Sequence, residues 1–220
     1  MKLHIYLFRH GQTYYNRDHY FTGWKDSKLT PRGFQDARKV AQKLKSKRID
    51  IGIHSGLSRS RDTLREVLKF HPECRKIMID PRMKERSYGD LSGHSHESFA
   101  KQFGEHEYRV LLHWHKLDHL SPEGHAAFVE KYGEHELALI RRSHTMKAPH
   151  GESMPMVERR VKAFIKDLVK MMKQKRVNVA IAAHGNSIRA WRKIWDKLSV
   201  EQEMKLENPW DDYFEYTVDC

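Results

Sequence analysis

The segment 177–183, which reads Val-Asn-Val-Ala-Ile-Ala-Ala, is apolar almost throughout. Such a run is typical of a strand that is covered on both faces, as in the parallel sheets of α/β proteins. Shorter apolar stretches predict further strands at 2–8, 49–54, 77–79 and 214–218. We therefore expect a sheet with helices on both of its faces.

Helical patterns fill the intervals between these strands. Thr30 and Pro31 predict the start of one helix, with Thr30 as the N-cap and Pro31 in the first turn. Further helices are expected at 58–70, after Glu152, and at 187–197. This alternation predicts a single domain over residues 1–220 with an α/β fold, a three-layer, doubly wound and mostly parallel sheet flanked by helices.

The segment at about 94–148 has no strand pattern and is rich in histidine, glutamate and aromatic residues, which predicts a helical cap insertion. It also contains a repeat. Phe-Ala-Lys-Gln-Phe-Gly-Glu-His-Glu at 99–107 matches Phe-Val-Glu-Lys-Tyr-Gly-Glu-His-Glu at 128–136. Two copies are too few for a solenoid, so we interpret the repeat as a local duplication that lengthens the cap.

Composition limits the class of protein. Hydrophobic residues make up 39% and charged residues 32% of the 220 residues, as in folded globular chains. No apolar run approaches the roughly 20 residues of a membrane span, and Arg9 interrupts the apolar N-terminus too early for a signal peptide. The two cysteines, Cys74 and Cys220, have no metal-ligand spacing. A cytoplasmic protein that does not bind membranes is expected.

The net charge of +12 attracts anions, either nucleic acid or small phosphorylated metabolites. Most of the basic residues are scattered over amphipathic segments such as 39–48 and 170–176, where they form solvated helix faces. Charge alone therefore does not distinguish between these two classes of partner.

A histidine followed by glycine stands at the end of two predicted strands, as Arg9-His10-Gly11 and as His184-Gly185-Asn186. Ligands of open α/β sheets bind at the carboxyl ends of the strands. A neutral imidazole held in one tautomer can act there as a nucleophile, and Arg9 can bind phosphate oxygens. Either histidine alone is better explained as an ordinary polar residue, but a His-Gly step at each of two strand ends indicates an anion site.

Two further segments supply candidates for the same site. Arg59 begins the helix that follows the second strand, where its side chain can reach the same edge of the sheet. Phosphoryl transfer also needs a proton donor for the leaving oxygen, and a carboxylic acid can serve. Glu85 is the candidate acid, and Asp90 is an alternative by residue type.

These segments, in their order and spacing, resemble the histidine phosphatase superfamily, and more narrowly its bisphosphoglycerate-dependent phosphoglycerate mutases. The resemblance covers most of the chain outside about 97–127. The matching motifs are Arg9-His10-Gly11-Gln12-Thr13 with Asn16, Phe21-Thr22-Gly23-Trp24, Glu85-Arg86-Ser87-Tyr88-Gly89, Arg141-Arg142-Ser143 with Pro149 and Gly151-Glu152-Ser153, His184-Gly185-Asn186-Ser187-Ile188-Arg189, and Asn208-Pro209 with 213–218.

The resemblance implies a role for each matching residue. His10 would carry the phosphoryl group, His184 would stabilise it during transfer, and Glu85 would donate and accept the proton. Arg9 and Arg59 would hold the phosphoryl oxygens. The substrate would be bound by Asn16, Thr22, Gly23, Tyr88, Arg141, Arg142 and Asn186. The resemblance also implies 2,3-bisphosphoglycerate as the primer, no metal, a place in glycolysis and gluconeogenesis, and a homodimer or homotetramer.

The chain departs from the mutase pattern on the substrate side. His96 stands where the mutases have a lysine that binds the substrate carboxylate, and Tyr14 replaces a usual acidic residue. The proline run after Arg142 is reduced to Met146-Lys147-Ala148-Pro149. The phosphohistidine chemistry is therefore a firmer expectation than the substrate.

Three functions remain as hypotheses. The first is a phosphoglycerate mutase that interconverts 3-phosphoglycerate and 2-phosphoglycerate, and the second is a phosphatase that hydrolyses small phosphomonoesters through the same histidine. The third is a catalytically silent nucleic-acid-binding protein. Because the chain has no nucleic-acid recognition motif and its catalytic set is intact, we do not expect nucleic acid as a partner. The histidine pairs His94/His96 and His113/His115 are expected on different helix faces, so we interpret them as surface residues and not as metal ligands.

Overall fold

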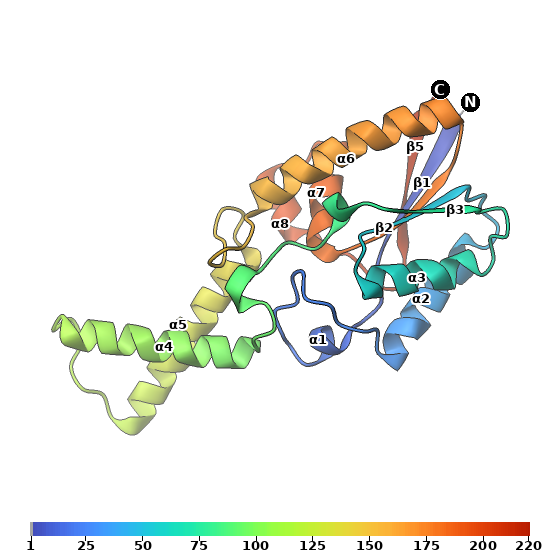
Figure 1. The fold of residues 1–220 in the computed structure, drawn as a ribbon. Helices are drawn as coiled ribbons and strands as arrows, with labels where there is room; N and C mark the ends of the chain where they lie inside the picture. Colours follow the sequence, from blue (N-terminus) through green and yellow to red (C-terminus); the bar gives the residue numbers. More distant parts are fainter. Residues whose placement is uncertain (1) are drawn as a thin grey trace.

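A computed structural model describes residues 2–220 of the chain, and it has the expected α/β fold (Figure 1). Five strands form one sheet in the order β3-β2-β4-β1-β5. Neighbouring strands are parallel, except that β5 runs antiparallel to β1 at one edge. The strands are β1 (Lys2–Arg9), β2 (Ile51–His54), β3 (Lys76–Ile79), β4 (Val179–Ala183) and β5 (Tyr213–Asp219).

Helices cover both faces of the sheet, and two of them project beyond one end of it (Figure 1). Two single turns of 3-10 helix, Pro81–Met83 and Gly89–Leu91, lie between β3 and α4. The α-helices are α1 (Tyr14–Arg17), α2 (Pro31–Leu44), α3 (Ser58–Leu68), α4 (His96–His113), α5 (Pro122–Arg142), α6 (Met154–Lys175), α7 (Gly185–Asp196) and α8 (Val200–Lys205). No helix in the described part of the chain has both the length and the hydrophobicity that crossing a membrane requires.

The alternation of side chains along β1 divides the core into two layers. Ile5 and Leu7 pack with α6 and α7 on one face, whereas Tyr6 and Phe8 pack with α2 and α3 on the other. The same alternation holds in β4, where Ile181 belongs to the first layer. Because successive side chains of a strand point to opposite faces, an apolar strand is stable only when both faces are covered.

The predicted boundaries differ from the observed ones by a few residues. The strand expected at 177–183 begins at Val179, and the helix expected at 58–70 ends at Leu68. The helix after β4 begins at Gly185 and not at 187, because His184 is already its N-cap. Gly185 is therefore the first residue of this helix, two positions after the strand ends at Ala183. The short helices α1 and α8 carry too little apolar periodicity to be predicted.

The segment expected to form a helical insertion contains α4 and α5, which pack against each other and project from the sheet as a hairpin (Figure 1). The two repeats lie where these helices cross. A Cβ atom added to Gly104 would lie 2.1 Å from the carbonyl oxygen of Val129, and one added to Gly133 would lie 2.0 Å from that of Ala100. Each repeat thus supplies a glycine that lets the other helix approach closely, which explains why the same motif occurs twice.

Candidate active site

The two histidines at the strand ends are neighbours because β1 and β4 are adjacent and parallel. Arg9 pairs with Ala183 at the last position of this ladder, and the backbone N–H of His10 donates to the carbonyl of Ala183 at 3.1 Å. The rings of His10 and His184 therefore lie side by side, with centroids 4.9 Å apart and planes inclined at 60°. Both side chains are buried.

His10 is held in one tautomer. Its Nδ1 lies 2.8 Å from the carbonyl oxygen of Gly11, which can only accept, so Nδ1 carries the proton. Burial, followed by the charges of Arg59 and Arg9, holds the pKa of His10 well below its ordinary value. At neutral pH the ring is therefore uncharged and Nε2 has a free electron pair, which is what a nucleophile requires.

Gly11 fixes the position of His10 through a close backbone contact. A Cβ atom on Gly11 would lie 2.0 Å from the carbonyl oxygen of Gly33 in α2, so only glycine fits there. The backbone N–H of Gly11 donates to Thr63 Oγ1 at 3.1 Å. The loop after β1 is thereby attached to both α2 and α3.

Arg59 is fully buried, and each of its guanidinium nitrogens has a partner. Nε donates to His184 Nδ1 at 3.3 Å, and Nη1 and Nη2 donate to the carbonyls of Lys25 and Gly23 at 2.9 and 2.7 Å. Because Nδ1 of His184 accepts, its Nε2 carries the proton and donates to Ser55 Oγ at 2.7 Å. Arg59 thus fixes the tautomer of His184 and holds the 22–25 loop over the site.

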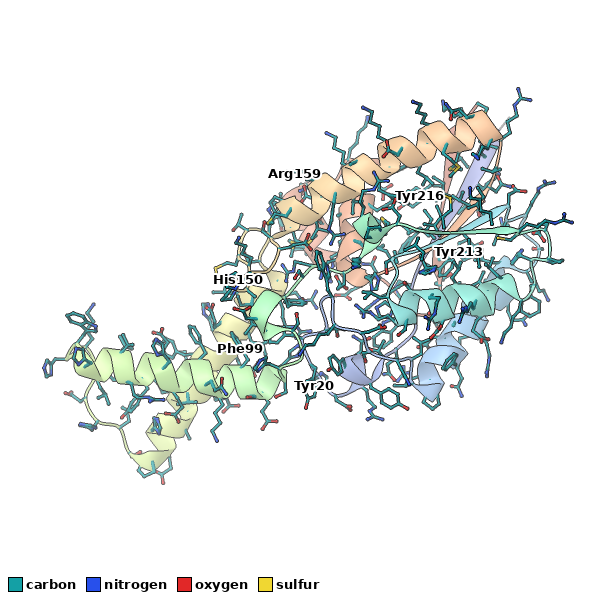
Figure 2. All side chains as sticks on the ribbon, viewed as in Figure 1. Tyr20, Phe99, His150, Arg159, Tyr213 and Tyr216 are labelled. Carbon is teal, nitrogen blue, oxygen red and sulfur yellow. The ribbon has the colours of Figure 1, made fainter. Side chains whose placement is uncertain are left out.

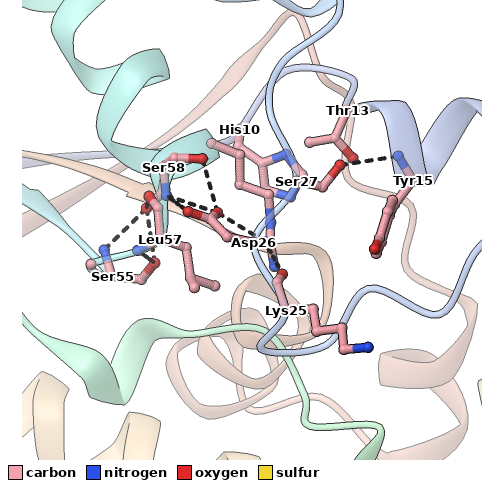
Figure 3. Close-up of polar contacts among 12 residues, drawn as sticks. His10, Thr13, Tyr15, Lys25, Asp26, Ser27, Ser55, Leu57 and Ser58 are labelled. Carbon is pink, nitrogen blue, oxygen red and sulfur yellow. Dashed lines mark hydrogen bonds and ion pairs between the residues drawn. The ribbon is translucent and has the colours of Figure 1, made fainter. Parts of the chain in front are cut away.

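The start of α3, which carries Arg59, is stabilised from the same loop. Leu57, the N-cap residue, has no side chain that can cap the helix. Asp26 supplies the missing acceptor: Ser58 donates to it from its backbone N–H at 3.0 Å and from its hydroxyl at 2.9 Å (Figure 3). A carboxylate at a helix N-terminus also interacts favourably with the helix dipole.

Arg9 and Glu85 complete the centre of the site. Arg9 stacks on Trp210 at 4.9 Å, and its buried Nε has no hydrogen-bond partner among the described residues. Glu85 Oε1 accepts from the backbone N–H groups of Arg86 and Asn186 at 2.8 and 3.1 Å. The other carboxylate oxygen of Glu85 is free to exchange a proton, and Arg9 contributes its positive charge to the lining of the cavity.

These side chains surround a cavity of about 330 Å³. Of the twelve residues predicted from the sequence, ten line it: Arg9, His10, Asn16, Thr22, Arg59, Glu85, Tyr88, Arg141, Arg142 and Asn186. His184 lies directly behind His10. Gly23 does not line the cavity, and its carbonyl binds Arg59 instead. Asp90, the alternative acid, also lies outside the lining and pairs with His150.

The cavity also has lining residues that were not predicted as site residues: Tyr15, His19, Tyr20, Phe21, His96, Gly185, Arg189, Glu207, Asn208 and Trp210. His96 packs edge-on against Phe21 at 4.6 Å, and burial together with Arg141 and His19 lowers its pKa to about 4. It is therefore neutral at pH 7. Arg189 could have been suspected, since it lies one helical turn after Asn186, and its Nη1 donates to Asn186 Oδ1 at 3.2 Å.

One group of side chains has the composition of a metal site. His144, Glu158 and Glu203 offer ligand atoms within 4.8 Å of one another. However, the ammonium of Lys193 lies 2.8 Å from Glu158 Oε1 and 3.2 Å from both His144 Nε2 and Glu203 Oε2. Lys193 thus takes the place that a cation would occupy. Within residues 2–220, neither His94/His96 nor His113/His115 belongs to such a group.

Comparison with known proteins identifies the family of the chain. The sequence matches the histidine phosphatase superfamily (branch 1) over residues 5–126 and 122–211. It is 33% identical over 205 residues to the 2,3-bisphosphoglycerate-dependent phosphoglycerate mutase of Parvibaculum lavamentivorans, an alignment covering 92% of this chain and 84% of that one.

Two solved structures have the same fold at low sequence identity. A mycobacterial glucosyl-3-phosphoglycerate phosphatase has a TM-score of 0.69 and 21% identity, with 99% of this chain and 91% of that one covered. The phosphoglycerate mutase of Bacillus anthracis has a TM-score of 0.66 and 20% identity, with 99% and 92% covered. The fold is thus shared by proteins named for two different reactions.

Proposed function

The chain belongs to the histidine phosphatase superfamily, and on this premise we propose that it is a phosphoglycerate mutase, which interconverts 3-phosphoglycerate and 2-phosphoglycerate through a phosphohistidine on His10. In this proposal 2,3-bisphosphoglycerate primes the enzyme and no metal takes part. The observation that carries it is the unprotonated Nε2 of His10, on which the charges of Arg59 and Arg9 act, in a cavity that Arg141 and Arg142 also line. The name of the Parvibaculum relative supports the same reaction.

The proposed chemistry assigns one task to each residue. Nε2 of His10 attacks phosphorus while the bond from phosphorus to the substrate oxygen breaks, and Glu85 gives that oxygen a proton. In the reverse step Glu85 takes the proton from the hydroxyl that receives the phosphoryl group. Negative charge spreads over the phosphoryl oxygens in the transition state. Arg9 and Arg59 therefore stabilise the transition state more than the bound substrate.

The cavity has further cationic groups that suit a second anionic group. Arg141, Arg142 and Arg189 line it, and a carboxylate or second phosphate bound there would hold the substrate with its hydroxyls toward His10. A phosphohistidine must also be kept from water while the intermediate reorients, and burial of His10 serves this purpose.

A phosphatase that hydrolyses small phosphomonoesters is the second candidate, and one observation favours it. His96 is neutral where the mutase pattern has a lysine, which removes a positive charge from the substrate side of the cavity. The fold is also shared with a glucosyl-3-phosphoglycerate phosphatase. In this alternative, water takes the phosphoryl group from His10.

Two assays on one preparation distinguish these candidates. Conversion of 3-phosphoglycerate is followed by coupling to enolase, with and without 2,3-bisphosphoglycerate, and hydrolysis is followed with a generic phosphomonoester. We expect primer-stimulated conversion that persists after treatment with a metal chelator. Rapid hydrolysis with negligible conversion would select the phosphatase, and neither activity would overturn both candidates.

We further propose that the enzyme works in the cytoplasm. Cys74 and Cys220 are both free thiols, and the proposed substrates are metabolites of that compartment. Expression with a fluorescent fusion partner, followed by fractionation, tests this proposal.

A further inference from the structure

The candidate acid Glu85 lies in a part of the chain that has no regular secondary structure. Residues 84–88, which we call the acid loop, join the two 3-10 turns Pro81–Met83 and Gly89–Leu91 and belong to neither a helix nor a strand. Carbonyl groups in such a loop have no partners in a ladder or a helix, so they need donors from elsewhere. The position of the Glu85 carboxylate therefore depends on the groups that bind the acid loop.

Arg160 of α6 donates five hydrogen bonds, one for each N–H of its guanidinium. Nη1 donates to the carbonyl of Lys84 and to that of Arg82, in the turn just before the acid loop. Nη2 donates to the carbonyl of Glu85 at 2.9 Å. The two remaining bonds, from Nε and Nη2, go to the two carboxylate oxygens of Glu152 at 2.9 and 3.0 Å. A lysine, which has no planar fork of donors, cannot reproduce this set of bonds.

Two further residues bind the acid loop. Glu152 Oε2 accepts from the backbone N–H of Ser87 at 2.9 Å, and the backbone N–H of Glu152 donates to the Ser87 carbonyl at 2.9 Å. Trp24 Nε1 donates to the carbonyl of Glu85 at 2.8 Å. The Glu85 carbonyl thus has two donors, Trp24 and Arg160, which come from segments far apart in the sequence.

Arg160 has a fixed orientation, whereas its neighbour Arg159 faces solvent. The side chains of Arg160 and Glu152 are only 16% and 12% exposed, and two parallel hydrogen bonds pair their charges. Arg159 is exposed and lies at the outer side of α6 (Figure 2). Because Glu152 balances the charge of Arg160, Arg160 acts on the site mainly through geometry.

The hydrogen bonds of Glu85 fix both its side chain and its backbone. Its Oε1 accepts from the backbone N–H groups of Arg86 and Asn186. Its backbone carbonyl accepts from Arg160 and Trp24. An acid must lie within hydrogen-bond reach of the oxygen that it protonates, and a shift of about 1 Å can cost about 10²-fold in rate.

We propose that Arg160 is a positioning residue for the proton transfer by Glu85. It fixes the acid loop, and through the loop it sets the distance from the Glu85 carboxyl group to the oxygen that leaves phosphorus. The proton moves from Glu85 to that oxygen as its bond to phosphorus breaks and Nε2 of His10 bonds to phosphorus. The inference rests on the proposed function, in which Glu85 is the acid, and it adds the group that places this acid.

Two esters of similar size separate the positioning of the acid from other effects. The leaving group of 4-nitrophenyl phosphate is a stable phenolate that needs little protonation, whereas that of benzyl phosphate is an alkoxide that needs a proton. We measure kcat/KM for both esters, since it reports the steps up to phosphorylation of His10. Arg160→Met should lower kcat/KM by about 10–10² for benzyl phosphate and by less than about threefold for 4-nitrophenyl phosphate. The matched control is Arg159→Met, at the exposed neighbour, which should change neither value.

Glu85→Gln, measured in parallel, separates failure of this inference from failure of the proposed function. Since it removes the proton, kcat/KM for benzyl phosphate should fall by about 10²–10⁴, and that for 4-nitrophenyl phosphate much less. If Glu85→Gln slows both esters equally, the acid assigned in the proposed function is wrong and this inference fails with it. If Glu85→Gln is selective but Arg160→Met changes both esters alike, only this inference is overturned, because a general loss of structure affects both substrates equally.

Two further variants apply if Arg160→Met does not fold. Trp24→Phe removes the other donor to the Glu85 carbonyl at a residue that is 47% exposed, so the fold should tolerate it. It should lower kcat/KM for benzyl phosphate selectively, by about threefold to tenfold. Arg160→Lys keeps the positive charge without the fork, so it should still slow benzyl phosphate selectively. Full activity of Arg160→Lys, or equal changes for the two esters in Trp24→Phe, would overturn the proposal.

Discussion

The guanidinium of Arg86 donates a hydrogen bond to the backbone carbonyl of Arg141, with 3.2 Å between the two atoms. The same side chain donates to the carbonyls of Ile140 and Ser143, so it caps the C-terminal end of α5. Arg86 directly follows Glu85 in the sequence, and the carboxylate of Glu85 accepts a hydrogen bond from the backbone N–H of Arg86. The dipeptide Glu85-Arg86 thus fixes both the candidate acid and the end of α5, which carries the arginine pair that lines the same cavity.

Replacing Arg86 by methionine should damage substrate binding more than chemistry. Arg86 is 1% exposed, and its loss leaves carbonyl groups at the end of α5 without donors, which costs about 1–3 kcal/mol each when they stay buried. We expect the free energy of unfolding to fall by roughly 2–3 kcal/mol and KM to rise about tenfold, with a smaller change in kcat. Urea unfolding and steady-state kinetics measure both. An unchanged KM in a folded Arg86→Met enzyme would show that Arg141 and Arg142 do not depend on this cap.

The two central residues should give different defects. His10→Ala is expected to abolish the acid-labile phosphoenzyme and all turnover, because the electron pair that attacks phosphorus is removed. Glu85→Gln keeps a side-chain oxygen for the N–H groups of Arg86 and Asn186 but cannot transfer a proton, so kcat should fall by about 10²–10⁴. Radiolabelled phosphate transfer and kcat measure the two effects. The exposed His106 provides the control, since His106→Ala should retain full activity. Full turnover by His10→Ala would contradict the whole scheme.

The centre of the site could be predicted because it depends on the regular part of the fold. Apolar runs identify β1 and β4, and both histidines follow these runs directly. Parallel strands of one sheet end at the same edge, so the strand pattern places both histidines at that edge. Their contact depends on β1 and β4 being neighbours, which only the structure shows.

The outer wall of the cavity could not be predicted because long-range contacts position it. His19 has a left-handed backbone with φ of 57°, and its carbonyl accepts from the backbone N–H of His96, 77 positions along the chain. Trp210 reaches the cavity by stacking on Arg9. Neither residue lies in a helix or strand with a recognisable period. The burial of Arg86 could not be predicted from the sequence either. An arginine side chain is rarely buried unless it has partners, and these partners are known only from the fold.

The repeated glycines of the hairpin should be intolerant of a methyl group. Gly104→Ala and Gly133→Ala each place a Cβ about 2 Å from a backbone carbonyl, so the helices must separate, and we expect each to cost about 1–3 kcal/mol. Gly124 in the first turn of α5 is the matched control. The nearest atoms to its added Cβ are 3.4 Å away, so Gly124→Ala should stabilise by about 0.5–1 kcal/mol. Urea unfolding measures all three. Equal effects at the three positions would mean that the crossing is looser than described.

A lysine at position 96 tests what the neutral histidine does. His96→Lys would add a positive charge beside Arg141, so a carboxylate-bearing substrate should bind with KM about tenfold lower. Hydrolysis of a phosphomonoester without a carboxylate should not improve. His94→Lys is the control, because His94 is exposed and lies outside the cavity lining. If KM for 3-phosphoglycerate stays the same in a folded His96→Lys enzyme, its carboxylate does not reach this part of the wall.

Glu203 should make the stability of the protein depend on pH. It is fully buried beside Glu158, and burial followed by the charge of Glu158 raises its pKa to about 7 from 4.5. Lys193 Nζ lies 3.2 Å from Oε2 but without the geometry of a hydrogen bond, so it compensates this carboxyl only in part. Between pH 4.5 and 7 the folded chain therefore keeps a proton that the unfolded chain has lost.

Unfolding releases that proton, so the contribution of Glu203 to stability is complete below pH 4.5 and is lost as the pH rises through 7. The difference between a pKa of 4.5 in the unfolded chain and about 7 in the folded chain corresponds to roughly 3 kcal/mol of stability. Glu203→Gln cannot titrate, so the free energy of unfolding of the wild type relative to this variant should fall across that pH range and level off above it. Urea unfolding at a series of pH values measures the difference, and Glu201→Gln, an exposed site on the same helix, should show no such trend. A constant difference between wild type and Glu203→Gln over this range would mean that Glu203 is already ionised in the folded protein, with Lys193 and His144 compensating it fully.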